Sequence, residues 1–253
     1  PCADYRCRRD YYCYLSGSGG LMSQATHLQV KNLTMAYADT VIQQNLNFSV
    51  KRGEIFIIMG GSGCGKSTLL RHLIGLMPPT AGDILINDTN IWDSSVEDRT
   101  RMISRSGVLY QSGALFSSMT LGENIALPLS EHTSLASYQI EKIASYKLSL
   151  VGLAGFEDYY PSEISGGMRK RAGLARAMAL DPDILFVDEP SAGLDPISAK
   201  LLDRLILELR DSLGTTIVMV THELESIFSV GDTAIFLDTD EKTMIASGPP
   251  KQL

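Results

Sequence analysis

The sequence predicts an α/β fold with an antiparallel β portion near the N-terminus and a helical subdomain inserted in the middle. Short alternating apolar patterns in "HLQVKNLTMAY" (27–37) and "NLNFSV" (45–50) indicate antiparallel strands. Later apolar runs such as "DILFVDE" (183–189) alternate with helical patterns, which is typical of a parallel sheet covered on both faces. Residues 112–164 interrupt this alternation and are expected to be mostly helical.

Each further element follows in chain order. "EIFIIM" (54–59) is a continuous apolar run, as in a strand buried on both faces. It leads through a glycine-rich turn into the helical pattern "KSTLLRHLIGL" (66–76), and "GDILIND" (82–88) predicts another strand. In the inserted subdomain, 137–153 predicts an amphipathic helix with the stem of Lys147 on its apolar edge. The remaining predicted elements are a helix at 197–213 and strands at 215–222, 233–238 and 242–248.

Composition limits the function classes. The chain has 253 residues, of which 44% are hydrophobic and 20% charged, as in an ordinary globular protein. Its formal net charge of −7 argues against non-specific binding to nucleic acid or to an anionic membrane surface. No apolar run approaches the roughly 18 residues that a transmembrane helix needs. Any role at a membrane therefore requires a partner.

The first 21 residues differ from the rest. They begin with Pro, contain Cys2, Cys7 and Cys13, and end in the linker-like "SGSGG" before Met22, a plausible natural start. We interpret 1–21 as a tag, a cloning scar or mis-assigned upstream translation, with a disordered native tail as the alternative, and 22–253 as the functional domain. One lone thiol in that domain, Cys64, indicates a reducing compartment.

The stretch "GGSGCGKS" (60–67) fits the eight-residue P-loop pattern, between a buried strand and a helix. Its glycines let successive backbone N–H groups turn towards phosphate oxygens, and the helix N-terminus adds its dipole. Lys66 is expected to reach the β- and γ-phosphates and Ser67 to ligate Mg²⁺. The alternative is a bare glycine-rich turn. The residues predicted to contact nucleotide here are Gly60, Gly61, Ser62, Gly63, Cys64, Gly65, Lys66, Ser67 and Thr68.

Cys64 sits inside this loop at a helix N-terminus, a position that lowers the pKa of a thiol. Two interpretations stay open: a reactive or regulatory cysteine, or a small side chain tolerated at a variable loop position.

The acidic partner of the loop is "ILFVDEP" (184–190), which places Asp188 and Glu189 at the end of a strand. An aspartate here can hold Mg²⁺ through water, and the adjacent glutamate can orient and deprotonate an attacking water. The alternative is a carboxylate pair that caps a solvated strand end.

A second glycine-rich turn, Ser165-Gly166-Gly167, opens the helical pattern "MRKRAGLARAMAL" (168–180). It lacks a lysine and a P-loop, so a separate nucleotide site is the weaker interpretation. A turn that contacts the same nucleotide from the far side, in a head-to-tail pair of copies, accounts for it better.

With these motifs, the chain from His27 to Leu253 resembles the ATPase subunits of ABC transporters. The resemblance implies a P-loop NTPase core of ABC ATPase type, Mg²⁺-dependent ATP hydrolysis and a sandwich dimer with a second copy. It identifies "ISGGM" (164–168) with the signature motif that binds the opposite subunit's γ-phosphate. Two departures are Met168 for Gln or Glu, and Gly61 for a common proline. The resemblance further implies Tyr37 as the adenine-stacking aromatic, Gln111 at Mg²⁺ and the water, Asp195 at the dimer seam and His222 as the switch histidine.

Met168, "YQSGALFSSMTLGENIALPLSEHT" (110–133) and "DEPSAGLDPI" (188–197) are similar to the Mla-type ATPases. That similarity implies phospholipid transport with an MCE-type partner, at the cytoplasmic face of the bacterial inner membrane. It also implies a permease helix docking beside the glutamine loop, on the apolar residues Leu115, Phe116, Met119 and Leu121.

The alternatives are an ABC ATPase for another substrate such as amino acids, a non-transport relative acting on DNA or the ribosome, and an inactive scaffold. The acidic chain has neither a long coiled coil nor a second cassette, which argues against the second alternative. Intact Lys66, Glu189 and His222 argue against the third. Arg169, Lys170 and Arg171 are interpreted as a solvated helix face, and His27, His72 and His132 as surface or packing residues.

Overall fold

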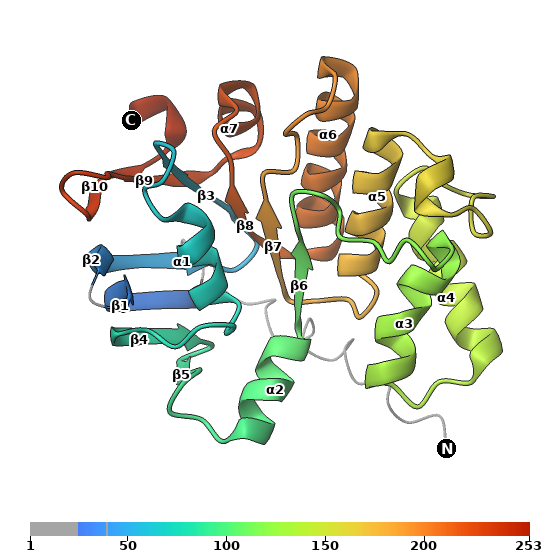
Figure 1. The fold of residues 1–253 in the computed structure, drawn as a ribbon, viewed down its shortest axis with the longest axis horizontal. Coiled ribbons are helices and arrows are strands. Elements are labelled where there is room, and N and C mark those ends of the chain that lie inside the picture. The colour runs from blue at the N-terminus through green and yellow to red at the C-terminus, as the bar shows by residue number, and fades with distance from the viewer. Residues whose placement is uncertain (1–24, 39) are drawn as a thin grey trace, which may run out of the picture.

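The computed structural model describes residues 25–38 and 40–253 (Figure 1), so the predicted leader with its three cysteines lies outside the described part. The chain forms a four-stranded sheet of order β2-β1-β4-β5 and a six-stranded sheet of order β10-β9-β3-β8-β7-β6. The first sheet contains β1 (Thr26–Tyr37), β2 (Thr40–Lys51), β4 (Ala81–Ile86) and β5 (Thr89–Asn90). The second contains β3 (Ile55–Gly60), β6 (Ser106–Leu109), β7 (Ile184–Asp188), β8 (Thr216–Val220), β9 (Thr233–Leu237) and β10 (Met244–Gly248).

The four-stranded sheet confirms the predicted antiparallel portion. β1 pairs antiparallel with β2 and with β4, and β4 pairs antiparallel with β5. Along β1, Leu28 and Val30 are buried in alternation, and Leu33 and Met35 are buried after the register shift that follows Val30. The ring of Phe48 on β2 stacks at 5.2 Å on Phe56 of β3, so the face of the small sheet packs against the large one.

The six-stranded sheet is parallel from β9 to β6, as predicted, but its last strand is not. β10 runs antiparallel to β9 at the edge. The central strands bury both faces. Ile57, Leu185 and Met219 point into one hydrophobic core, whereas Phe56, Phe186 and Val218 point into a second core on the other face. The sheet is thus sandwiched between two layers.

Different elements supply the two layers. Helices α5 (Gly166–Ala177), α6 (Pro196–Leu213) and α7 (Leu224–Val230) contribute to the first core, and α1 (Lys66–Leu73) with the antiparallel sheet contributes to the second. Helix α2 (Val96–Ser104) precedes β6, and η3 (Pro250–Gln252) follows β10. None of the described helices is long and apolar enough to cross a membrane.

The predicted helical stretch 112–164 contains α3 (Leu121–His132), α4 (Ser137–Leu150) and the short helix η2 (Pro161–Glu163). Thr120 and Glu123 form a capping box that fixes the start of α3. Lys147 of α4 is buried along its stem, and its Nζ lies 2.5 Å from Asp181 Oδ1. In Figure 1, α3 and α4 form a group on the far side of α5 from the antiparallel sheet.

Candidate nucleotide-binding and catalytic site

The core of the predicted site gathers where three parallel strands end. Gly60 is the last residue of β3, Asp188 is the last of β7, and His222 follows β8. Loops at the carboxyl ends of parallel strands meet at one edge of the sheet, which is where open α/β sheets bind ligands. The fold therefore brings together the P-loop, the acidic pair and the histidine, which are far apart in the sequence.

The P-loop adopts a conformation that its glycines permit. Gly63 and Gly65 have φ of +81° and +98°, in the left-handed region. A Cβ on Gly65 would lie 2.6 Å from Ile42 Cγ2 of β2, so a larger residue has no room there. Lys66 starts α1, and its Nζ donates to the carbonyl oxygens of Gly60 at 2.9 Å and Gly61 at 2.8 Å. The lysine ammonium is thus held over the loop, where phosphates are expected.

Cys64 departs from the sequence-based expectation. Its side chain is 1% exposed, and burial raises the pKa of its thiol, although the Lys66 charge acts in the opposite direction. The expectation of a lowered pKa at this helix N-terminus is wrong, because desolvation of the thiolate outweighs the Lys66 charge and the backbone hydrogen bonds that favour it. The geometry favours the small tolerated side chain over the reactive cysteine.

Glu189 and His222 form a direct contact. The Glu189 side chain is 12% exposed and the His222 side chain 62% exposed, with Nδ1 2.8 Å from the carboxylate. Glu189 has φ of +47°, a left-handed conformation that is unfavourable for a residue with a side chain. Its backbone N–H donates to Val220 O of β8 at 2.8 Å. The carboxylate is thereby held at the open edge of the sheet.

Asp188 has the properties of a cation ligand. Its Oδ1 is buried and accepts no hydrogen bond within the described part of the chain. Burial, followed by the charge of Glu189, raises the pKa of Asp188, while Arg71 and Lys66 lower it. A carboxylate left in this state gains from a hard cation, since oxygen ligands are what Mg²⁺ prefers. Asp188 therefore has the chemistry of a magnesium ligand, and the predicted ligands Ser67 and Gln111 are exposed.

The second glycine-rich turn is placed as a helix cap. Ser165 Oγ accepts from the Met168 N–H at 3.2 Å and so starts α5, leaving Ser165 and Gly166 exposed. A Cβ on Gly167 would lie 3.1 Å from Ser198 Oγ on α6. In Figure 1, α1 and α5 lie on opposite sides of β7 and β8, so this turn does not close over the P-loop of the same chain.

The remaining predicted residues surround this edge. Asp195 caps α6, since its Oδ1 accepts from the N–H groups of Ile197 and Ser198 at 3.0 Å. The Ser198 hydroxyl bond is the main reason that the pKa of Asp195 lies below its ordinary value. Tyr37 ends β1 and is 42% exposed, with hydrogen bonds from Thr68 and then Arg71 lowering its pKa.

The prediction that Lys170 lies on a solvated helix face is wrong. Lys170 is 7% exposed, not solvated, and its Nζ donates to the carbonyl oxygens of Pro190 and Ala192, both at 2.6 Å. Arg171 is half-buried and donates to Val151 O at 2.7 Å, whereas Arg169 is exposed. A run of three basic residues has no helical periodicity that would show which one turns inwards.

The expected docking residues are only partly accessible. Leu121 is fully buried in the first core, so the prediction that a permease helix docks on it is wrong: as the first residue of α3 it packs inwards. Leu115 and Met119 are half-buried, and Phe116 is 50% exposed with the Arg176 guanidinium 5.4 Å above its ring.

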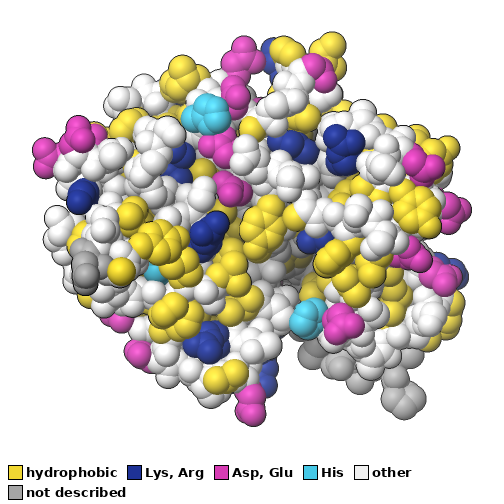
Figure 2. All heavy atoms as spheres, in the orientation of Figure 1, with side chains coloured by type: hydrophobic (Ala, Val, Ile, Leu, Met, Phe, Trp, Pro, Cys, Tyr) yellow, Lys and Arg dark blue, Asp and Glu magenta, His cyan; other side chains and the backbone are white. Residues whose placement is uncertain are grey.

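A groove of about 440 Å³ adjoins this loop. Its lining includes Ile103, Val108, Tyr110, Pro128 and Arg176, from α2, β6, α3 and α5. Arg176 also donates to Ala114 O, which links the groove to the loop of Phe116. Figure 2 shows the surface hollowed in its lower centre, between the parts that carry α2 and α3.

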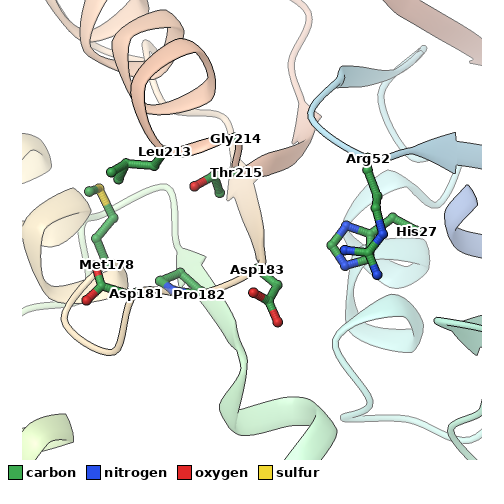
Figure 3. Close-up of a pocket in the computed structure, with 9 residues that line it drawn as sticks. All are labelled: His27, Arg52, Met178, Asp181, Pro182, Asp183, Leu213, Gly214 and Thr215. Atoms are coloured by element: carbon green, nitrogen blue, oxygen red, sulfur yellow. The ribbon is translucent and has the colours of Figure 1, made fainter. Parts of the chain in front are cut away.

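A separate pocket of about 220 Å³ lies at the amino ends of β7 and β8, on the opposite edge from the P-loop. Figure 3 shows His27 and Arg52 on one side of it and Met178 and Leu213 on the other, with Asp183 between. His27 is 2% exposed, and its Nδ1 lies 2.7 Å from Thr216 Oγ1. Burial, then Arg52, lowers the pKa of His27 to about 4, with Asp183 opposing. None of the predicted nucleotide residues lines this pocket.

Comparison with known proteins agrees with this geometry. A family profile described as ABC transporter matches residues 43–192. The structure of cbiO1 from Clostridium perfringens, part of the ABC transporter complex cbiONQ, superposes with a TM-score of 0.82 at 29% identity over 90% of each chain. The dimeric ATP-binding cassette MJ0796 bound to ADP and Pi superposes with a TM-score of 0.80 at 28% identity, covering 88% of this chain and 98% of that one. The chain therefore belongs to the ABC transporter family, as an ATP-binding ATPase subunit of a transporter.

Within that family, the resemblance to the Mla-type ATPases is confirmed. The chain is 44% identical over 226 residues to the intermembrane phospholipid transport system ATP-binding protein MlaF of Haemophilus influenzae, covering 89% of this chain and 85% of that protein. MlaF of Escherichia coli is 40% identical over 231 residues, covering 91% of this chain and 85% of that protein. The probable ribonucleotide transport ATP-binding protein mkl of Mycobacterium leprae is 42% identical over 237 residues, covering 94% of this chain and 68% of that protein.

Proposed function

We propose that this chain binds ATP and Mg²⁺ between two copies of itself and hydrolyses the ATP to power phospholipid transport through a permease. The choice of phospholipid as the cargo rests on the 44% and 40% identity to two MlaF proteins over 85% of their length. The permease is linked to an MCE-type protein, and the ATPase acts at the cytoplasmic face of the inner membrane. The name of mkl supports ribonucleotide as a second candidate cargo.

Each site residue has a role in this proposal. The loop 60–68 wraps the phosphates, with Lys66 at the β- and γ-phosphates, and Tyr37 stacks on the adenine. Ser67, Asp188 and Gln111 hold Mg²⁺, which neutralises charge on the phosphates when bound. Ser165, Gly166 and Gly167 of the second copy close the site, and Asp195 lies at the seam between the copies.

Hydrolysis then requires one positioned water. Glu189 accepts the proton of that water, and His222, 2.8 Å from its carboxylate, orients the glutamate and contacts the γ-phosphate. Little covalent chemistry is needed in phosphoryl transfer, so positioning and charge account for the rate. Closure and reopening of the two copies drive the permease.

The permease helix is proposed to dock in the groove beside Tyr110 and Arg176, with Phe116 at its rim. Burying a Phe side chain stabilises a contact by roughly 1.5–3 kcal/mol, which is about 10- to 150-fold in affinity. We expect Phe116→Asp to keep ATP binding and to release the subunit from detergent-solubilised permease. Phe228→Asp, which changes a Phe of similar exposure (49%) on α7, is the matched control and should stay bound.

Co-purification from detergent-solubilised membranes tests the cargo. Capture of an MCE-associated permease supports the phospholipid proposal, and loss of the subunit should then weaken the outer-membrane permeability barrier. Capture of a ribonucleotide, amino-acid or metal permease contradicts the phospholipid proposal.

A further inference from the structure

Lys170 of α5 places its ammonium group in a cluster of three backbone carbonyls. Its Nζ lies 2.6 Å from Pro190 O, 2.6 Å from Ala192 O and 3.3 Å from Glu189 O. An ammonium has three N–H donors, so the three oxygens match its full hydrogen-bonding capacity. Burial lowers the pKa of Lys170, and the Glu189 charge raises it. A buried cation persists only when it is satisfied in this way.

All three carbonyls belong to the loop 189–195, which joins β7 to α6 and carries Glu189. Glu189 stands at φ of +47°, a conformation that persists only when its surroundings hold it. Its N–H is held by Val220 O of β8, and its C=O faces Lys170. Val220 therefore holds the N–H of Glu189, and Lys170 of α5 holds its C=O.

We propose that Lys170 is a positioning residue for hydrolysis, which holds the Glu189 loop in its active conformation and ties that loop to the turn at 165–167. Lys170 lies in the second turn of α5, the helix that Ser165 caps. Figure 1 shows α5 and α6 side by side, with the loop between β7 and α6 running along α6. The inference rests on the proposed function, since it assumes that Glu189 is the base.

Arg171 provides a matched comparison on the same helix. It is also a cation that donates to backbone carbonyls, those of Val151 at 2.7 Å and Gly152 at 3.2 Å. These carbonyls follow α4 and do not belong to the Glu189 loop. If buried basic residues of α5 act only on stability, both positions should behave alike.

The experiment compares Lys170→Met, Lys170→Gln and Arg171→Met by thermal midpoint, ATP KM and kcat. Met has an unbranched chain of similar length without donors, and Gln keeps an N–H donor. We expect Lys170→Met to lose at least fivefold in kcat with KM within twofold, and Lys170→Gln to lose between twofold and fivefold in kcat. Arg171→Met should lower the thermal midpoint but keep kcat within twofold in the folded protein.

A smaller loss in kcat for Lys170→Met overturns the inference, and so does a loss matched by Arg171→Met. If Lys170→Met does not fold, a kcat for Lys170→Gln within twofold of wild type overturns it instead. Glu189→Gln is measured alongside. If that variant hydrolyses ATP at the wild-type rate, the proposed base is wrong; if it is inactive while Lys170→Met is not, only the role of Lys170 fails.

Discussion

The Nδ1 atom of His222 lies 2.8 Å from the carboxylate of Glu189, and this contact joins the ends of β8 and β7. Because Glu189 is nearly buried and His222 largely exposed, the histidine covers the carboxylate on its solvent side. In the proposed function, a nucleotide phosphate at this edge meets both groups together.

Glu189→Gln removes the proposed base and keeps the size of the side chain. We expect ATP affinity within about threefold of wild type and turnover at least 100-fold lower, because proton transfer of this kind contributes about 10²–10⁴-fold. Steady-state phosphate release and equilibrium nucleotide binding check this. Glu223→Gln is the control, since this exposed carboxylate lies 3.9 Å from the other ring nitrogen of His222. Near-wild-type turnover in Glu189→Gln contradicts the role of the base.

Mixing two inactive variants tests whether the site is shared. Gly166→Asp places a negative charge where a partner's phosphate is expected, and Lys66→Ala weakens phosphate binding. Each mixed dimer then keeps one composite site without either change, so activity should partly return on mixing. ATPase assays on confirmed mixed dimers measure this, and no recovery would argue against sharing.

Cys64 should react slowly in the folded protein. Burial hides its thiol and raises its pKa, so little thiolate is accessible at pH 8. We expect alkylation by iodoacetamide at least tenfold slower in the native protein than in urea. Peptide mass spectrometry separates Cys64 from the cysteines at 2, 7 and 13. Equal rates in both conditions would restore the reactive interpretation.

The buried His27 predicts that stability depends on pH. Its folded pKa of about 4 lies below the ordinary histidine pKa of 6.5, so the unfolded chain binds the proton more readily between these values. The contribution of neutral His27 to the free energy of unfolding is fully present above pH 6.5 and is lost as the pH falls towards 4. The loss amounts to about 3 kcal/mol at most.

Urea unfolding at pH 7.5 and pH 4.5 measures this effect. His27→Gln should show a smaller fall in the free energy of unfolding than wild type, whereas the exposed His132→Gln should follow wild type. A His27→Gln protein with an unchanged fall contradicts the assignment.

Much of the fold could be predicted because the central strands are continuous apolar runs. β3, β7 and β8 bury both faces, so four or five consecutive apolar residues mark each of them as a central strand. β6 and α2 were not predicted. β6 has only four residues, and α2 has no buried side chain, so neither has a clear apolar periodicity. The antiparallel direction of β10 depends on the turn that follows β9, not on apolar pattern.

The site residues could be located by motif, but their environments could not. The spacing of Lys66 and Ser67 identifies a phosphate loop, yet only tertiary packing shows that Cys64 is buried or that Leu121 faces inwards. Lys170 makes the same point, because its partners lie about twenty positions later in the chain. A single sequence does not show which one of several neighbouring basic residues is buried.

The antiparallel sheet also sets the shape of the phosphate loop from behind. Gln43 of β2 is fully buried, and its Nε2 donates to Cys64 O at 2.8 Å and to Asp238 O at 2.7 Å, while Ile42 fills the space beside Gly65. The loop is therefore preorganised: its conformational entropy is lost during folding and not when nucleotide arrives. Gln43→Ala should consequently slow nucleotide association and weaken affinity without touching the ligand, which makes β2 a remote determinant of ATP affinity.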